Sequence, residues 1–355
     1  MFFIKFLRLF KKLQNFWADW SGRSGQVYVE QRVDQYRNMW RAIAREIGAE
    51  FEELATDLWE LRKNGQRTRI MTNLMEFDNP VILAMADRKP LIHKLLRAHD
   101  VAIPEHEVFC LNTLDKACAF LQRFPEGIVI KPANGYGGKG VTTHILGPKE
   151  AKVAAILASL YANELLLEQM IPGECYRLLV LDGNMIHAVK RAGPRVIGDG
   201  ESTVQQLIDT ENARRRLSGE RELANDRDSQ FTLDYQGYSM NSIPAAYTSF
   251  IVKSVNDSDD RNGIEVRTVY NEDVTDQVCN SIRNDAEKVA LLLGSRLIGV
   301  DIITRDISVP LKESGGTCNE VNTTPALHHH YNSKNEEYPQ AGLLVAESLL
   351  SPPVQ

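Results

Sequence analysis

The sequence predicts an α+β fold in which a helical N-terminal region precedes a mixed region of short strands and helices. Apolar residues recur at helical spacing through Gln31–Ile47, which indicates an amphipathic helix. From Gly127 onward the pattern changes to short apolar runs separated by glycine-rich turns. Asp182-Gly183-Asn184 separates two such runs and is a strong β-hairpin signal. Hairpins in place of regular strand–helix–strand units favour the α+β class.

The N-terminal region, up to Gly65, is expected to be mainly helical. Glu50–Lys63 repeats the helical spacing of Gln31–Ile47, and Asn64-Gly65 is typical of a helix end. Residues 1–20 place Phe, Leu and Trp at helical spacing between basic residues. We expect this segment to dock on its own domain or on a second subunit, because such a stripe is usually part of a core. A helix lying on an anionic membrane surface is the alternative.

The rest of the chain alternates between predicted helices and strands. The helices are expected at Asp87–His99, Pro148–Leu160, Thr203–Asn212 and Val274–Leu293. The strands are expected at Arg67–Leu74, Gly127–Lys131, Val141–Leu146, Leu165–Gln169, Tyr176–Leu181, Met185–Arg191, Leu297–Thr304 and Thr317–Asn322.

Composition excludes several classes of protein. The 355 residues include 41 Lys and Arg against 47 Asp and Glu, a net charge of −6 that argues against a nucleic-acid-binding surface. The five cysteines are odd in number and form no CxxC pair, which excludes a disulfide framework or a thiolate zinc site. This usage favours a reducing compartment and therefore the cytoplasm. No apolar run approaches the length of a membrane span.

A glycine-rich loop follows the predicted strand that ends at Lys131. Four glycines stand close together in it, at Gly135, Gly137, Gly138 and Gly140. A dinucleotide fold would need a helix straight after the loop, whereas Val141 begins a strand. A P-loop would need Gly-Lys-Ser/Thr, which is absent. We therefore expect a loop whose backbone amides close over a polyphosphate, with Lys131 and Lys139 adding charge; an exposed hairpin with a solvated lysine is the alternative.

Three residues near the C-terminal end suggest a metal site. Asp301 lies inside an apolar run, where a carboxylate is costly unless it is paired or bound to a metal. Glu320 and Asn322 stand two residues apart on the next predicted strand, so their side chains share a face. Two carboxylates and an amide oxygen are hard ligands that suit Mg²⁺. Ordinary polar residues at strand ends are the alternative.

Several motifs in a fixed order resemble one known superfamily. Residues 85–332 resemble the ATP-grasp superfamily and look most like the ligase domain of the cyanophycin synthetases. More distant similarity extends to glutathione synthetases and D-alanine–D-alanine ligases. The matching stretches begin at Asp87-Arg-Lys-Pro, Val129-Ile-Lys-Pro, Leu167-Glu-Gln-Met, Val196-Ile-Gly-Asp, Asp273-Val-Thr-Asp, Gly299-Val-Asp-Ile and Glu320-Val-Asn-Thr.

The resemblance implies a fold of two α+β subdomains that grip ATP, and it implies roles for individual residues. Lys89 and Lys131 would contact the ATP phosphates. Arg177 and Arg191 would hold the transferred phosphoryl group or a substrate carboxylate, with solvated strand-end arginines as the alternative. Asp301, Glu320 and Asn322 match the Mg²⁺ positions, and Mn²⁺ is a possible substitute. The remaining nucleotide contacts would come from Glu168, Gln169 and Ile171 at the adenine and from Glu174 at the ribose.

The resemblance further implies an enzyme, an ADP-forming ligase that joins a carboxylate to an amine through an acyl phosphate. Amino acids or short peptides would be its substrates, and a homo-oligomer is expected. A ligase that tags a protein or peptide acceptor and a non-catalytic ATP-binding protein are the alternatives. The sequence identifies no general base. Neighbours on an extended chain face opposite ways, so His328–His330 are not expected all to bind one metal, and each is expected to be a pocket-wall or surface residue.

The same resemblance divides the chain into three expected regions. These are a mainly helical N-terminal region at residues 1–84, a subdomain with the glycine-rich loop at 85–166, and a subdomain with the metal and substrate sites at 167–355. The length leaves no room for a second ligase domain, so one kind of bond is expected.

Overall fold

The computed structural model describes residues 25–135, 138–191, 193–217, 222–223, 225, 227–253, 271–331 and 336–351. The amphipathic segment at residues 1–20 and Gly137 of the glycine-rich loop lie outside the described residues, so their predicted roles stay predictions. The part of the chain that is described forms two compact units. We call residues 104–170 with 192–270 the loop unit, and residues 23–103, 171–191 and 271–355 the arginine unit. The three-part division by chain order stays a prediction.

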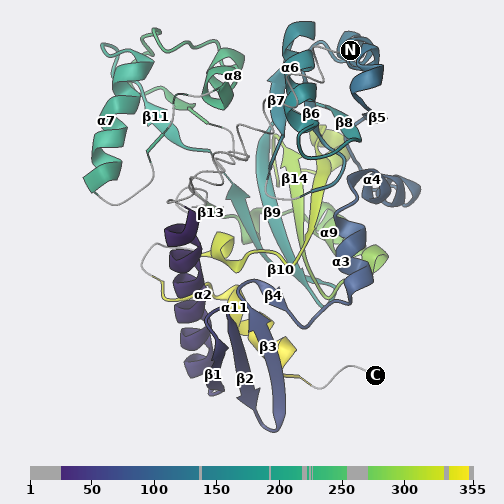
Figure 1. Cartoon of the computed structure of the whole chain (residues 1–355), viewed down its shortest axis with the longest axis vertical. Coiled ribbons are helices and arrows are strands. Elements are labelled where there is room, and N and C mark those ends of the chain that lie inside the picture. Colours follow the sequence, from purple (N-terminus) through teal and green to yellow (C-terminus); the bar gives the residue numbers. More distant parts are fainter. Residues whose placement is uncertain are drawn as a thin grey trace. The chain divides into compact units, whose positions relative to one another are not determined.

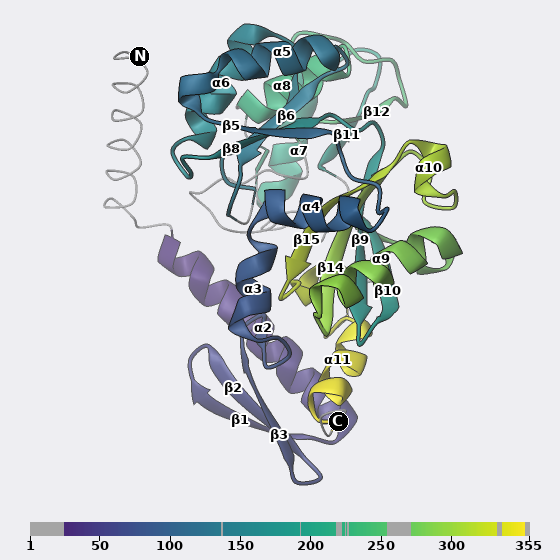
Figure 2. The same cartoon turned by 90° about the vertical axis from the view of Figure 1, so that its right-hand side faces the viewer.

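The loop unit is built on a four-stranded antiparallel sheet with the strand order β5-β8-β6-β7. Helices α5 and α6 pack on it (Figure 2), and the alanines of α6 allow a close approach to Ile128, Ile130 and Leu167. The glycine-rich loop connects β6 to β7. The elements are β5 His106–Phe109, η1 Leu111–Thr113, α5 Asp115–Arg123, β6 Ile128–Pro132, β7 Thr142–Ile145, α6 Pro148–Ala158 and β8 Leu165–Gln169.

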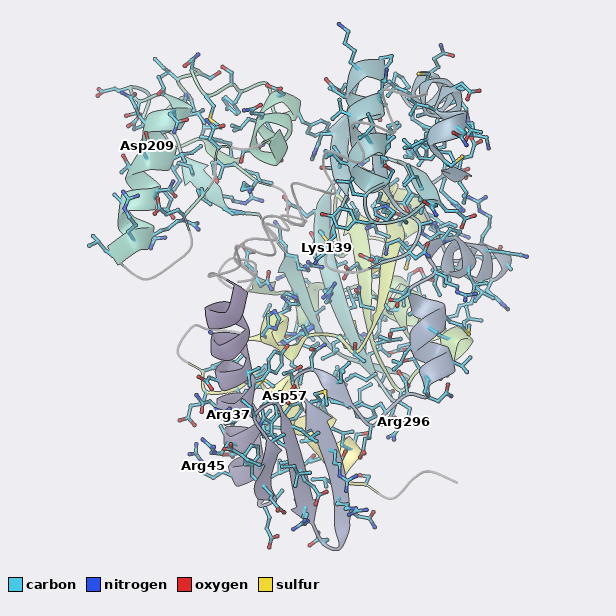
Figure 3. All side chains as sticks on the ribbon, in the orientation of Figure 1. Arg37, Arg45, Asp57, Lys139, Asp209 and Arg296 are labelled. Carbon is cyan, nitrogen blue, oxygen red and sulfur yellow. The ribbon has the colours of Figure 1, made fainter. Side chains whose placement is uncertain are left out.

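A second part of the loop unit carries a short antiparallel pair of strands, β11 and β12, with two helices. Val196, Ile208 and Phe250 form its apolar cluster. Helix α7, which carries Asp209 (Figure 3), begins close to the predicted position and continues for several residues beyond the predicted end. The elements are β11 Arg195–Ile197, α7 Val204–Leu217, α8 Arg227–Tyr235 and β12 Ser249–Ile251.

The arginine unit is built on a five-stranded antiparallel sheet with the order β13-β10-β9-β14-β15 (Figure 1). One face is apolar and packs against α4 and α9 through Leu178, Val180, Ile298 and Val300. The predicted hairpin is confirmed as β9 and β10. The elements are α3 Pro80–Ala86, α4 Lys89–Ala98, β9 Glu174–Leu181, β10 Asn184–Arg191, β13 Glu272–Asp273, η3 Thr275–Gln277, α9 Asn280–Leu293, β14 Leu297–Thr304, α10 Leu311–Ser314, β15 Thr317–Thr323 and η4 Leu327–His330.

The opposite face of this sheet is apolar at one end and charged at the other. At one end Leu179, Leu181 and Leu297 join a core with the fully buried Trp40 and Trp59. At the other end the same face carries charged side chains. The apolar end is covered by α2 and α11 and by a second antiparallel sheet, whose elements are α2 Gly25–Ile47, β1 Glu50–Ala55, β2 Leu58–Lys63, β3 Gln66–Met71, β4 Leu74–Met75 and α11 Ala341–Leu349. Figure 3 shows Arg37 on α2 near Asp57 of the β1–β2 turn, and Arg37 donates to the Thr56 carbonyl there.

One predicted helix is wrong, and another begins later than predicted. Glu50–Lys63 forms strands β1 and β2, and Asn64-Gly65 is a hairpin turn with positive φ at both residues, not a helix end. Trp59 and Leu61 are buried on the alternating spacing of a strand. The helix predicted at Val274–Leu293 begins only at Asn280, because Asp273 accepts hydrogen bonds from Thr275 and stabilises a turn.

Two further observations concern the cysteines and the hydropathy of the helices. All five cysteines are free thiols, and burial together with nearby carboxylates raises the pKa of Cys318, which keeps that thiol neutral. None of the helices in the described part of the chain is long and apolar enough to cross a membrane.

Candidate functional site

Two buried arginines share one buried carboxylate on the charged end of the arginine-unit sheet. Arg177 on β9 donates from Nε to Asp301 Oδ1 at 2.7 Å and from Nη2 to Oδ2 at 2.8 Å. Arg191 on β10 donates from Nη1 to Oδ2 at 3.0 Å. All three residues are at most 6% exposed. Arg191 Nε is buried and has no hydrogen-bond partner among the described residues.

The strand register explains why these three side chains meet. Arg177 is directly opposite Asp301 of β14, so their side chains leave the sheet on the same face. Gly299 makes room, because a Cβ there would lie 3.5 Å from Cδ of Arg177 and 3.1 Å from Cβ of Pro325. Burial opposes the charge of Arg177, but the Asp301 carboxylate outweighs it and raises the pKa of the guanidinium. Asp301 therefore holds two charged guanidinium groups in fixed orientations.

The three predicted metal ligands lie together on β14 and β15. Asp301 is directly opposite Glu320, and the amide of Asn322 donates to Asp301 Oδ2 at 3.4 Å. Lys89, the first residue of α4, lies with Nζ 3.1 Å from Glu320 Oε1. The structure thus brings together the three residues that sequence spacing and the resemblance assigned to a metal, and adds Lys89 beside them.

This donor set fits a hard divalent cation. Two carboxylates and one amide oxygen on neighbouring strands match the oxygen ligands that Mg²⁺ prefers, and Mg²⁺ usually keeps several waters or phosphate oxygens as well. The described residues contain no group of three or more His, Cys, Asp or Glu side chains that could hold a metal. A cation here would therefore depend on Asn322 and on ligands from the substrate.

In the loop unit Lys131 and Glu168 form a second buried ion pair. Lys131 Nζ lies 2.6 Å from Glu168 Oε2, and the two side chains are 5% and 2% exposed. They project from neighbouring strands, β6 and β8, at diagonal positions of the ladder. Glu168, predicted at the adenine, is thus in contact with Lys131, predicted at the phosphates.

In the described part of the glycine-rich loop, glycines have positive φ, a backbone conformation that residues with a Cβ rarely adopt. Gly138 and Gly140 have φ of +71° and +70°. A Cβ on Gly140 would also lie 2.7 Å from a ring carbon of Tyr161. Lys139 between them is exposed (Figure 3). The loop therefore has a defined base at Gly140 and an exposed lysine next to it.

The other predicted nucleotide contacts have ordinary partners. The Gln169 N–H donates to the Glu105 carbonyl, and the Ile171 side chain is buried. Glu174 Oε1 lies 3.7 Å from Lys190 Nζ. Their assignment to adenine and ribose stays a prediction.

Sequence reasoning missed a chain of polar side chains next to the arginines. His187 of β10 and His330 of η4 face each other with their Nδ1 atoms 3.0 Å apart. His187 Nε2 lies 3.6 Å from Asp273 Oδ2. Both histidines are buried, His330 completely, so His330 is not a surface residue, and its place in a pocket wall stays a prediction. No sequence signal joins residues that are 143 positions apart.

Known proteins resemble this chain in sequence and in fold. No protein-family model matches it. Its sequence is 28% identical over 328 residues to a cyanophycin synthetase of Nostoc sp., covering 87% of this chain and 35% of that protein. It is 30% identical over 273 residues to a glutathione biosynthesis bifunctional protein of Streptococcus mutans, covering 73% of this chain and 34% of that protein.

A solved structure supports the fold. The bifunctional glutathione synthetase from Pasteurella multocida aligns with a TM-score of 0.52 and 21% identity, over 85% of this chain and 41% of that chain. The chain spans about a third of the length of the curated relatives it matches. This chain is thus similar in sequence to cyanophycin synthetases and to glutathione biosynthesis bifunctional proteins, and its fold is similar to that of a glutathione synthetase.

Proposed function

We propose that this chain is an ATP-dependent, ADP-forming ligase that joins a carboxylate to an amine through an acyl phosphate. The Arg177–Asp301–Arg191 cluster is the observation that carries the proposal. Two buried guanidinium groups face one carboxylate, so one positive charge is in excess among the described residues of the cluster. This excess of buried positive charge, together with the Arg191 Nε–H that has no hydrogen-bond partner among the described residues, favours binding of an anion such as a phosphoryl group or a carboxylate.

In the proposed reaction, the substrate carboxylate attacks the γ-phosphorus of ATP and ADP leaves. Arg177 and Arg191 hold the resulting acyl phosphate and then stabilise the oxyanion that forms when the amine attacks its carbonyl carbon. Because Asp301 already fixes both guanidinium groups, little reorganisation is needed as the charge develops. Phosphate leaves as the amide forms.

Asp301, Glu320 and Asn322 would hold Mg²⁺, which when bound neutralises charge on the ATP phosphates. Lys89 beside Glu320 would add a fixed positive charge toward the same phosphates. In the loop unit, Lys131 and the glycine-rich loop would contact the phosphates of the nucleotide.

The test is a pairwise screen of free amino acids and short peptides with ATP and Mg²⁺, read by ADP release and product mass. We expect ADP release that requires both a carboxylate and an amine, together with a product lighter by one water than the sum of the pair. Acceptance of peptides as the amine would indicate a tagging ligase. Absence of ADP release with every pair would contradict the proposal.

A further inference from the structure

A chain of three side chains, Asp273, His187 and His330, ends in a histidine that has the features of a general base. His330 lies on η4, and its ring meets that of His187 edge-on, with the centroids 5.1 Å apart. The His330 Nε2 atom is buried and has no hydrogen-bond partner among the described residues. An unpartnered buried nitrogen is costly unless a ligand or a proton uses it.

The position of each group in this chain is fixed from outside it. Thr275 donates from its N–H and from its hydroxyl to Asp273 Oδ1, which leaves Oδ2 toward His187. The side chain of Asn271 donates to the carbonyl of His329 and attaches η4 to the sheet edge. Asp273 is partly exposed, with 39% of its side chain accessible, so the far end of the chain reaches solvent.

Taking the Nε2–H of His187 to face the Asp273 carboxylate, 3.6 Å away, assigns the tautomers of both histidines. His187 carries its proton on Nε2 if it faces the Asp273 carboxylate, and its Nδ1 is then an acceptor. His330 must in that case donate from Nδ1, since the two Nδ1 atoms are 3.0 Å apart. The Nε2 atom of His330 is left with a bare lone pair, which is what a general base needs.

Burial and, after it, neighbouring charges disfavour the charged form of His330. Burial, followed by the charges of His187, Arg177, His328 and Arg191, lowers the pKa of His330 well below its ordinary value of 6.5. A proton that stayed on His330 would therefore be unfavourable beside the two arginines. A proton passed on to His187 would lie near the Asp273 carboxylate, because His187 Nε2 is 3.6 Å from Asp273 Oδ2.

Resting on the proposed ligase function, we propose that His330 accepts the proton of the attacking amine and passes a proton to His187. The amine lone pair forms the C–N bond, and an N–H proton moves to Nε2 of His330. The Nδ1 proton of His330 moves to Nδ1 of His187, which becomes an imidazolium beside Asp273. The C–O bond to phosphate breaks, and phosphate leaves with the electron pair. His330 acts on the substrate, whereas His187 and Asp273 are positioning residues.

The test separates the two halves of the reaction with hydroxylamine as a probe. Hydroxylamine traps an acyl phosphate without a base, because its adduct is acidic enough to lose a proton to water. In His330→Gln we expect amide formation to fall about 100-fold, while hydroxamate formation with the same carboxylate stays within about threefold of wild type. The amide rate of the variant should recover as the pH is raised. His99→Gln is the control, because His99 is exposed and lies outside this chain of side chains, and it should leave both rates unchanged.

Asp273→Asn is the second variant, because its exposed position makes it tolerant of substitution. It should lower kcat for amide formation by about tenfold with little change in KM for the amine. An equal loss of hydroxamate and amide in His330→Gln, or an unchanged amide rate in both variants, would overturn the inference.

Nitrogen NMR of the wild-type protein tests the tautomers without turnover. The expected result is a neutral His330 protonated on Nδ1 at pH 6.5; a proton on its Nε2 would overturn the inference. Failure of the proposed ligase function would instead appear as absence of ADP release in the wild type.

Discussion

The two buried ion clusters, one in each unit, differ in their ratio of charges. In the loop unit, Lys131 faces Glu168, one cation to one carboxylate among the described residues. In the arginine unit, Arg177 and Arg191 share Asp301, and Arg191 keeps an N–H without a described partner. A balanced pair can be satisfied by itself, whereas an excess of buried positive charge calls for an anion. The comparison teaches that the ratio of buried charges, more than burial alone, indicates a binding role.

The largest expected effect comes from removing the carboxylate of either cluster. Asp301→Asn and Glu168→Gln should each lower the free energy of unfolding by about 3–5 kcal/mol, because a buried cation loses its partner. Urea unfolding of the purified protein measures this. The double variant Lys131→Met/Glu168→Gln should regain most of the loss, since no buried charge remains. Arg177→Met/Asp301→Asn should regain less, because Arg191 is still charged; equal recovery would contradict the comparison.

A second expected effect concerns activity. Arg191→Gln should lower kcat by about 100- to 1000-fold, because a fixed donor to the developing oxyanion is lost. ADP release with the pair found in the screen measures it. The matched control is Arg296→Gln, which removes an arginine from the same unit (Figure 3) that pairs one-to-one with Asp182. It should keep full activity, and its cost in unfolding free energy should be at most about 1 kcal/mol.

A smaller effect is expected at the base of the glycine-rich loop, near Lys131. Gly140→Ala should lower the free energy of unfolding by about 1–3 kcal/mol, because a side chain is strained at positive φ and would meet Tyr161. Gly147→Ala is the control, since Gly147 has a negative φ and the added Cβ would have no neighbour closer than 3.8 Å. Thermal unfolding of both variants measures the difference, and equal melting temperatures would be the contrary result.

The smallest effect comes from an exposed carboxylate whose partners, in the part of the chain that the structure describes, are hydrogen-bond donors and not cations. Asp199 accepts from the Ser202 hydroxyl and from the backbone N–H groups of Ser202 and Glu201, which lower its pKa from 3.8 to about 2. A lowered folded-state pKa gives stability that is present above pH 3.8 and lost as the pH falls through about 2. The stability difference between wild type and Asp199→Asn should therefore shrink over this range. A difference that is constant with pH would show that these hydrogen bonds do not favour the charged form.

Local signals in the sequence predicted much of the fold. The predicted strands Leu165–Gln169 and Leu297–Thr304 coincide with β8 and β14, because short apolar runs between turn residues mark strands within a few positions. Glu50–Lys63 failed because its apolar residues fit both periods, and the hairpin turn at Asn64-Gly65 decided between them.

The site was predicted only in part, because register joins residues that are distant in sequence. Spacing placed Glu320 and Asn322 on one face of a strand, as the structure has them. The spacing did not predict that Asp301 lies opposite Arg177, because the sequence of a strand does not show which strand it pairs with. The His187–His330 contact joins a strand to a short helix and left no pattern in the chain.

Strand β9 carries both Arg177, which we propose binds the ligand, and Leu179 of the apolar core, and this links ligand binding to the stability of the arginine unit. Leu179 follows Arg177 by two residues on the same face and belongs to the core that contains Trp59 of β2. If the unit unfolds cooperatively, a ligand held by Arg177 at 100 times its Kd adds about 2.7 kcal/mol to the stability of the whole unit. Backbone amides of β2 should then exchange with solvent more slowly, although β2 has no part in binding.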